Sequence, residues 1–273
     1  MSAQLATVSA FIKGAPPGEL PNVVSDIKVL TNNDPKIISE LGPVFQSYNE
    51  NQFTTVKLPD TDQNIIVSAY NSLGEGRYYD VNSCLSFSFD HETQKPSEVQ
   101  SYMLESNHSD FVKSISKNLR LYLNEHYSNA SCGVYPTNED SEIAILIVAN
   151  QYSPRNFWNG QWKSLYIYSP ATSCLSGQIN VDVHYYEDGN VRLLTSKPVS
   201  LSVSHDSTET VLKEIKGLEK KYQEELTNGF QNLSEGAFRG LRRQLPVTRQ
   251  KVEWDKIAGY RLGQDIGGGS IKK

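Results

Sequence analysis

The 273-residue sequence has few cysteines and no long apolar run, and each absence excludes a class of protein. Cys84, Cys132 and Cys174 are widely spaced and form no CxxC pair, which excludes a zinc knuckle and a disulfide framework. No stretch approaches the ~20 apolar residues needed to cross a bilayer, and the first residues do not resemble a secretory signal. We therefore expect a cytoplasmic protein without a transmembrane segment.

Catalytic motifs are also lacking. His91-Glu92 begins like a zinc-protease helix, but Lys95 stands where the second histidine belongs. The glycine-rich segment at 263–269 follows no expected strand, so it does not predict a phosphate-binding loop. His184 stands among titratable side chains, yet packing at a hairpin end explains it better than acid-base chemistry. The sequence predicts no enzyme, no cofactor and no metal site, although a site built from unrecognised residues of the β-rich region remains an alternative.

Charge is unevenly distributed along the chain. Residues 236–273 contain nine basic and three acidic side chains, a net charge of +6. That leaves 17 of the 26 basic and 28 of the 31 acidic residues in the remaining 235 positions, a net charge of -11. An acidic body with a basic arm indicates that the arm meets an acidic partner.

Residues 1–50 have helical periodicity, which predicts three short helices in a small bundle. The first carries an inward stripe of Leu5, Val8, Phe11 and Ile12 and is ended by the prolines that follow. The second is expected to begin at Pro17, with Leu20, Val24, Ile27 and Leu30 inward. Asp34-Pro35 is typical of the start of the third.

Residues 51–130 predict a small irregular sheet followed by a helix. The runs 54–58, 65–70 and 81–89 are rich in β-favouring residues, and Leu85, Phe87 and Phe89 alternate with serines. Helical spacing returns from Ser97 to about Tyr127, with Val99 and Met103 among its apolar positions. An interruption around residues 107–109 is the alternative.

Residues 131–235 predict five consecutive antiparallel strands and a long helix. The run 142–149 is read as a buried strand, and Asn159-Gly160 between aromatic residues predicts a tight turn with its return strand at 164–168. Two more strands are expected around a turn at 188–190. Asp206 and Glu209 have capping-box spacing for a helix reaching about Gly229, whose apolar stripe is expected to cover the sheet.

Residues 236–273 have the pattern most typical of a binding element. Phe238, Leu241 and Leu245 recur at helical spacing until Pro246, and a second short helix is plausible around Trp254. An ordinary terminal helix docked on its own domain fits about equally well. As a binding element, the arm suits an acidic protein surface or an anionic membrane, whereas the acidic body and the absence of an RNA-binding motif disfavour nucleic acid.

Three segments resemble the α-subunit family of the heterodimeric F-actin capping proteins. These are residues 157–163 (FWNGQWK), 183–191 (VHYYEDGNV) and 241–249 (LRRQLPVTR), with further likeness at 16–20 (PPGEL) and 260–263 (YRLG). The resemblance implies an α+β subunit with an N-terminal three-helix bundle, a small β region, a five-strand antiparallel sheet covered by a long helix, and a C-terminal amphipathic tentacle. It implies that the sheet joins five strands of a capping protein beta subunit in one ten-stranded sheet.

The resemblance also implies a function and a set of site residues. The heterodimer is expected to bind the barbed end of actin filaments independently of calcium, to block subunit addition and loss without severing, and to act in cortical actin structures. Arg239, Arg243 and Arg249 are carried over as actin-binding, and Arg239 stands where other family members have lysine. Phosphoinositides are expected to inhibit by competing for these arginines. Weaker electrostatic contacts are expected from Arg242, Lys251 and Lys256, and packing of the tentacle from Trp254, Ile257 and Leu262.

A different class of function remains as an alternative. The chain would then be a basic-tailed module that binds anionic lipid or another acidic protein through residues 236–273. That reading predicts tight vesicle binding by this chain alone, lost when the arm is removed.

Overall fold

The computed structural model describes residues 3–59, 61, 63–187, 190–204 and 207–235. The chain divides into two units, Met1–Glu214 and Ile215–Lys273. The first contains nearly all of the described helices and strands. The described part of the second is the remainder of the last helix.

The described residues from 3 to 52 form four helices, not the predicted three. Gly42-Pro43 begins a separate helix, because Pro43 has no N–H to continue the preceding one and is tolerated only in a first turn. One apolar core, extending from Leu5 to Tyr48, contains residues of every helix. The helices are α1 (Ala3–Gly14), α2 (Leu20–Leu30), α3 (Pro35–Ser39) and α4 (Gly42–Gln52).

The predicted helix start at Asp34 is confirmed, whereas two predicted inward positions are wrong. The Asp34 carboxylate accepts a hydrogen bond from the Lys36 N–H at 3.0 Å, as an N-cap should. Phe11 and Leu30 are 57% and 74% exposed. Helix α2 begins at Leu20 and not at Pro17. Periodicity therefore predicted that these segments are helical, but it assigned too many apolar residues to the buried face of each helix.

The next region contains two small sheets and one 3-10 turn. The four-stranded sheet is a meander that buries Tyr78 and Phe87 completely. The predicted helix start at Ser97 is wrong, because the segment around Val99 forms a strand that pairs with its neighbour. The elements are β1 (Thr55–Lys57), β2 (Asn64–Ile66), η1 (Ala69–Asn71), β3 (Ser72–Gly74), β4 (Arg77–Asp80), β5 (Leu85–Asp90), β6 (Lys95–Ser101) and the helix α5 (Ser109–His126).

Five consecutive antiparallel strands follow, which confirms the predicted sheet. The strand order is that of the sequence, β11-β10-β9-β8-β7. The centre of β8, from Ile143 to Val148, is buried on both faces, as its continuous apolar run predicted. The strands are β7 (Ala130–Thr137), β8 (Glu142–Ser153), β9 (Trp158–Ser169), β10 (Cys174–Tyr185) and β11 (Val191–Ser202).

The tight turn predicted at Asn159-Gly160 is wrong. Both residues lie inside β9, where Gly160 is paired with Gln151 and Val183. The chain reverses earlier, in the 3-10 turn η2 (Pro154–Asn156), and Phe157 completes the turn with a φ of 55°. Pro154 lacks the N–H that a continuing ladder would need, so it provides the stronger break.

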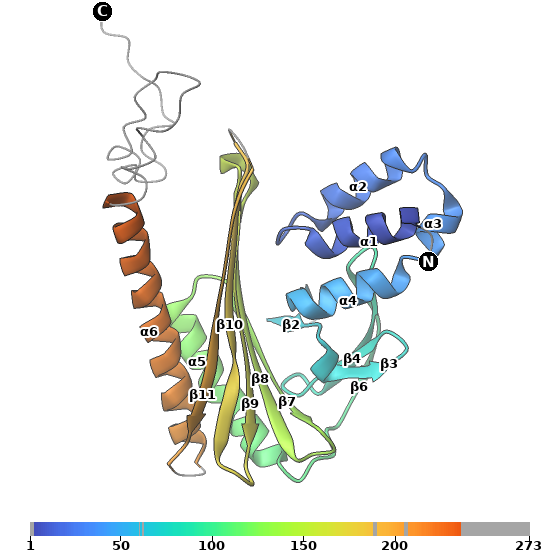
Figure 1. The fold of residues 1–273 in the computed structure, drawn as a ribbon. Helices are drawn as coiled ribbons and strands as arrows, with labels where there is room; N and C mark the ends of the chain where they lie inside the picture. Colours follow the sequence, from blue (N-terminus) through green and yellow to red (C-terminus); the bar gives the residue numbers. More distant parts are fainter. Residues whose placement is uncertain (1–2, 60, 62, 188–189, 205–206, 236–273) are drawn as a thin grey trace, which may run out of the picture. The chain divides into compact units, whose positions relative to one another are not determined.

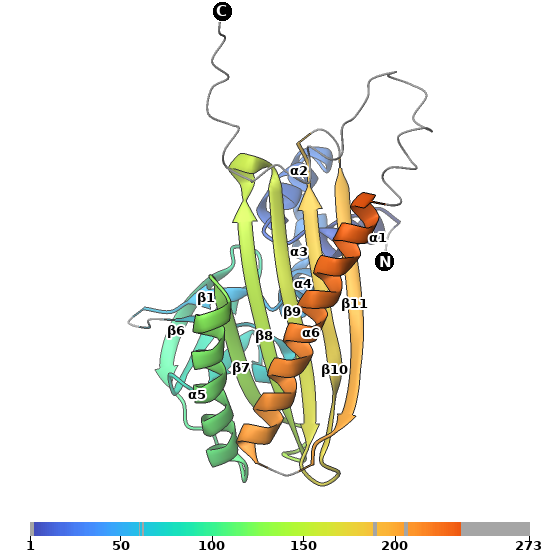
Figure 2. The same cartoon turned by 90° about the vertical axis from the view of Figure 1, so that its left-hand side faces the viewer.

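Helices cover both faces of the sheet. Helix α5 packs against β7, and the Phe111 ring stacks on Tyr168 of β9 with centroids 5.5 Å apart. Figures 1 and 2 show α5 on one face and α1–α4 on the opposite face. The sheet is therefore the middle layer of the first unit.

The long helix expected after the sheet is confirmed as α6 (Thr208–Glu235). The hydroxyl of Ser207 accepts from the Thr210 N–H at 3.2 Å and thus acts as its N-cap. The predicted cap, Asp206, lies outside the described residues, as do two residues of the predicted 188–190 turn. Val211 is fully buried. Cover of the sheet by the rest of this helix stays a prediction.

Candidate functional site

Among the described residues, strand β11 is an edge of the five-stranded sheet and pairs on one side only, with β10. Just beyond the last pair of that ladder, the Val203 N–H donates to the Ser173 C=O at 2.8 Å. Bonded and non-bonded pairs alternate in an antiparallel ladder, so odd-numbered residues of β11 bond to β10. The even-numbered residues direct their backbone polar groups outward: Arg192, Leu194, Ser196, Pro198, Ser200 and Ser202.

Prolines in both edge strands agree with this assignment. Pro198 of β11 falls at an outward position, where its missing N–H breaks no bond to β10. Just before β7, the Asn129 C=O accepts from the Asn150 N–H of β8 at 3.1 Å, so odd-numbered residues of β7 bond to β8. Pro136 of β7 is therefore outward too. Each edge strand therefore keeps a complete inner ladder.

The two edges differ in what surrounds them. Edge β7 is contacted by α5 and by β2. On β11, Val191 and Leu194 are each 64% exposed. A 12-residue strand with an outward row of backbone groups and exposed apolar side chains is a template for another strand.

Arg192 anchors this edge to the N-terminal helices. Its Nε and Nη2 donate to the two carboxylate oxygens of Asp182 at 2.9 and 2.6 Å, and its Nη1 donates to the Gly14 C=O at 2.6 Å. The hydrogen bonds that the guanidinium donates to the Asp182 carboxylate raise the pKa of Arg192. This fork-to-fork contact fixes the start of β11 against both β10 and α1.

A buried polar contact joins the α1–α2 connection to the end of the sheet. The Nδ1 atom of His184 lies 2.6 Å from a carboxylate oxygen of Glu19, and its Nε2 lies 2.7 Å from the Asn190 side-chain oxygen. The Asn159 amide donates to the same Glu19 oxygen at 3.0 Å. His184 is 6% exposed. Its role is structural, which agrees with the packing interpretation of its neighbourhood.

Lys163 lies between β9 and helix α4. Its ammonium donates to the Asn51 C=O at 2.5 Å and lies 5.5 Å from the centre of the Phe53 ring. Burial lowers the pKa of this amine, and Asp182 partly opposes the shift. Partial burial of a charge is tolerated here because a carbonyl and an aromatic face both stabilise it.

The described residues show no group of three or more His, Cys, Asp or Glu side chains arranged to hold a metal ion. Within the same part of the chain, no helix has the length and apolar character needed to cross a bilayer. The features gathered at the sheet edge and its anchors are those of an interface that binds protein.

Comparison with known families decides which kind of protein this is. A family model described as F-actin capping protein alpha subunit matches residues 8–265. The chain belongs to the F-actin capping protein alpha subunit family. This is a structural, actin-capping family and not a known family of enzymes.

Relatives in this family resemble the chain along its whole length. The F-actin-capping protein subunit alpha of Chaetomium thermophilum is 61% identical over 273 residues, covering 100% of this chain and 99% of the relative. The Neurospora crassa protein of the same name is 60% identical and is covered completely. That of Caenorhabditis elegans is 34% identical and covers 94% of this chain.

A solved structure supports the fold of this family member. The homodimeric actin capping protein alpha subunit from Plasmodium berghei superposes with a TM-score of 0.73, covering 90% of this chain and 98% of its own. The sequences are 19% identical. The likeness supports the mixed α+β architecture with its five-stranded antiparallel sheet.

The nine site residues expected from the family resemblance all follow Glu235. They lie outside the described residues, so the structure neither brings them together nor separates them. Sequence reasoning did not find the Glu19–His184 contact or the Asp182–Arg192 pair. The partners in the first contact are separated by 165 positions, and no local pattern connects them.

Proposed function

We propose that the chain is the alpha subunit of a heterodimeric capping protein that binds the barbed end of actin filaments. In this proposal it blocks subunit addition and loss, needs no calcium and does not sever. The observation that carries it is the family match over residues 8–265, which includes most of the basic arm. The heterodimer would act in the cytoplasm, at cortical actin structures.

The outward edge of β11 is the proposed binding surface for a capping protein beta subunit. A strand of the partner placed there would satisfy the outward N–H and C=O groups and cover Leu194. Five strands from each subunit would then form one ten-stranded sheet. The stability of the chain would depend on the concentration of its partner.

The arm at 236–273 is the proposed actin-binding tentacle. Arg239, Arg243 and Arg249 would contact acidic groups at the filament end, and the arm's net charge of +6 supports this. Exposed ion pairs contribute only ~0.2–1 kcal/mol each, so several must act together and capping should weaken as salt rises. Phosphoinositides would compete for the same arginines. Arg242, Lys251 and Lys256 would add charge, and Trp254, Ile257 and Leu262 would pack the arm.

Growth from filament seeds tests this proposal. The chain, purified with a beta subunit, is expected to stop growth at the fast end at substoichiometric amounts, with and without a calcium chelator. Filament number should stay constant, because no severing occurs. A rise in filament number, or a strict need for calcium, would contradict those parts of the proposal.

The basic arm also supports one alternative, a module for anionic lipid or another acidic protein. Vesicles with and without an anionic lipid distinguish it. Tight binding by the heterodimer to anionic vesicles, together with no effect on filament growth, would favour the alternative over capping.

A further inference from the structure

The two halves of β11 are held to the sheet in different ways. Val199, near its end, and Val203, just beyond it, are buried, so burial of apolar surface fixes the chain there. At its start, Val191 and Leu194 are largely exposed and gain little from burial. A strand end with few buried apolar contacts opens easily. The first half of β11 therefore needs another source of order.

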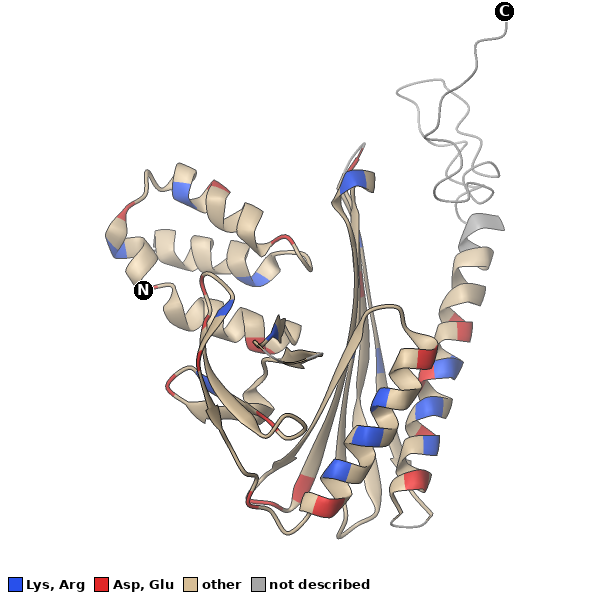
Figure 3. Ribbon diagram, turned by 180° about the vertical axis from the view of Figure 1, so that it is seen from behind, with Lys and Arg blue, Asp and Glu red and all other residues tan. Residues whose placement is uncertain are grey.

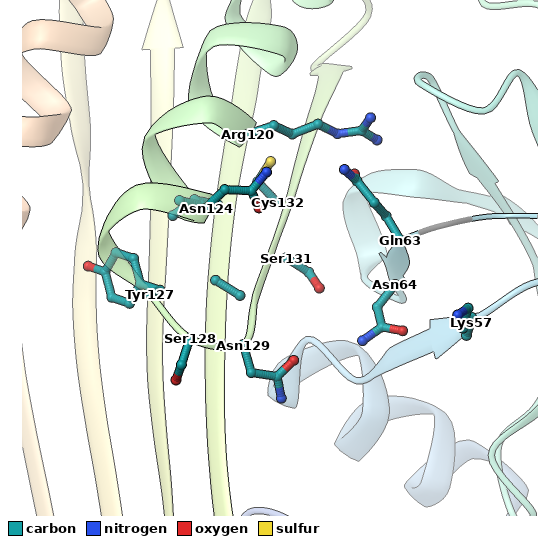
Figure 4. Close-up of a pocket in the computed structure, with 12 residues that line it drawn as sticks. Lys57, Gln63, Asn64, Arg120, Asn124, Tyr127, Ser128, Asn129, Ser131 and Cys132 are labelled. Atoms are coloured by element: carbon teal, nitrogen blue, oxygen red, sulfur yellow. The ribbon is translucent and has the colours of Figure 1, made fainter.

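The opposite edge of the sheet obtains its order from neighbouring elements. Strand β7 is contacted by α5 and by β2. Figure 4 shows Asn64 of β2, Ser131 of β7 and Arg120 of α5 lining one pocket beside that edge. Among the described residues, no strand lies beyond β11. Contacts on a face of the sheet must then hold the start of β11.

The side chain of Arg192 supplies such a contact with β10. In the ladder, Arg192 pairs with His184, and Asp182 pairs with Leu194. The ion pair of Arg192 with Asp182 therefore runs diagonally across two steps of the ladder, with donor–acceptor distances of 2.9 and 2.6 Å. Because the contact is two-pronged, it fixes the direction of the guanidinium as well as its distance.

The same side chain also binds the end of α1. Its Nη1 atom donates to the Gly14 C=O at 2.6 Å. Gly14 is the last residue of α1, and the final carbonyls of a helix have no partner within the helix. A cation at this position also complements the negative end of the helix dipole. Arg192 thus caps α1 and joins it to the edge strand.

We propose that Arg192 is a positioning residue for binding of the beta subunit. Its side chain lies on the face of the sheet that carries α1, whereas its backbone polar groups and those of Leu194 point out of the edge. The anchor holds these groups in the plane of the sheet before a partner strand arrives, which removes an ordering cost from binding. This inference rests on the proposed role of β11 as the edge that the beta subunit occupies.

The dissociation constant of the heterodimer, measured by light scattering over a dilution series, tests the inference. Arg192→Gln is expected to raise it about tenfold, because the start of β11 must then be ordered during binding. Asp182→Asn should have the same effect, and the double variant should be no weaker than either, because all three remove one contact. Arg155→Gln, at an exposed arginine of η2, is the matched control and should bind like the natural chain.

A second measurement separates positioning from general stability. Leu194→Ala should weaken the natural heterodimer about threefold, because the partner would cover this exposed side chain. In the Arg192→Gln background the effect of Leu194→Ala should be smaller, because the unanchored strand does not present residue 194 to the partner. A purely structural role of Arg192 predicts equal effects in the two backgrounds.

Two results would overturn the inference. One is a natural dissociation constant for Arg192→Gln, or for Asp182→Asn if the first variant does not fold. The other is an equal effect of Leu194→Ala in the two backgrounds. If β11 is not the interface at all, Leu194→Ala and Ser200→Pro would also leave the affinity unchanged, which distinguishes failure of the proposed assembly from failure of the anchor alone.

Discussion

The buried contact between Glu19 and His184 is a single-residue link between the helical region and the sheet. Glu19→Ala would leave the imidazole and the Asn159 amide without their shared acceptor. The free energy of unfolding should fall by about 2 kcal/mol, because a buried polar group left without a partner costs about that much. Urea unfolding of the purified heterodimer measures it.

Glu40→Ala provides the matched control, since Glu40 is an exposed acid in the same helical region. Its effect should stay within about 0.5 kcal/mol, as for most surface changes. Equal stability of the two variants would show that the Glu19 contact contributes nothing.

Cysteine reactivity is a second property of single residues. Burial raises the pKa of Cys132 to about 12, so its thiol stays protonated at pH 8, and it is only 8% exposed. Cys84 is exposed. Because the thiolate is the nucleophile, iodoacetamide at pH 8 should label Cys84 at least tenfold faster than Cys132 in the native protein. Peptide mass spectrometry measures both rates, and equal labelling before unfolding would contradict the burial of Cys132.

At the scale of the elements, the outward edge of β11 gives the sharpest test of assembly. Ser200 is outward, so Ser200→Pro removes an N–H that would donate to the partner but leaves the ladder with β10 complete. The dissociation constant of the heterodimer should rise about tenfold, as expected for one lost interfacial hydrogen bond. Light scattering over a dilution series measures it.

Ser200→Ala is the control, because it removes the hydroxyl and keeps the N–H. It should dimerise like the natural chain. If both variants keep the natural affinity and fold normally, β11 is not the edge that the beta subunit occupies.

Sequence patterns predicted some of these elements better than others. All five strands of the central sheet were predictable, because strand periodicity is local and each run ends in turn residues. The turn predicted at Asn159-Gly160 is wrong, and local sequence could not show this, because both residues lie inside β9 and Asn159 donates to Glu19, which lies 140 positions away. The extra helix α4 was missed at Gly42-Pro43, a local signal that was present.

One part of the candidate site, the basic arm, could be predicted from the sequence, whereas the other, the outward edge of β11, could not. The basic arm follows from composition and from segments that resemble the family, because charge and sequence motifs need no tertiary information. The outward set on β11 could not be predicted, because it depends on which residues bond to β10. Pro198 was a usable signal, since a proline within a strand indicates an edge.

At the scale of the whole molecule, two surfaces are proposed to act together. One is the β11 edge, which is proposed to bind the beta subunit. The other is the basic arm, which is proposed to bind actin. The first surface lies on β11, within the described residues. The sequence outside the arm is net acidic and the arm is net basic, which is consistent with this division. Dimerisation and capping should therefore be separable by mutation.

Filament-seed growth with an arm variant tests whether the basic arm is needed for capping. The heterodimer with three arginines changed to alanine should fold and dimerise but cap at least tenfold more weakly, because several weak ion pairs are lost together. A control with three exposed lysines of the described residues changed should cap normally. Figure 3 shows Lys and Arg positions on several helices of the described part of the chain. The changed arginines are Arg239, Arg243 and Arg249, and the control lysines are Lys36, Lys113 and Lys117.

The natural heterodimer must stop growth at the fast end in the same experiment, and its effect should weaken as salt rises. Weak capping by the arginine variant alone would support both the function and the role of the arm. A folded natural heterodimer that leaves growth at the fast end unchanged would contradict the capping function itself.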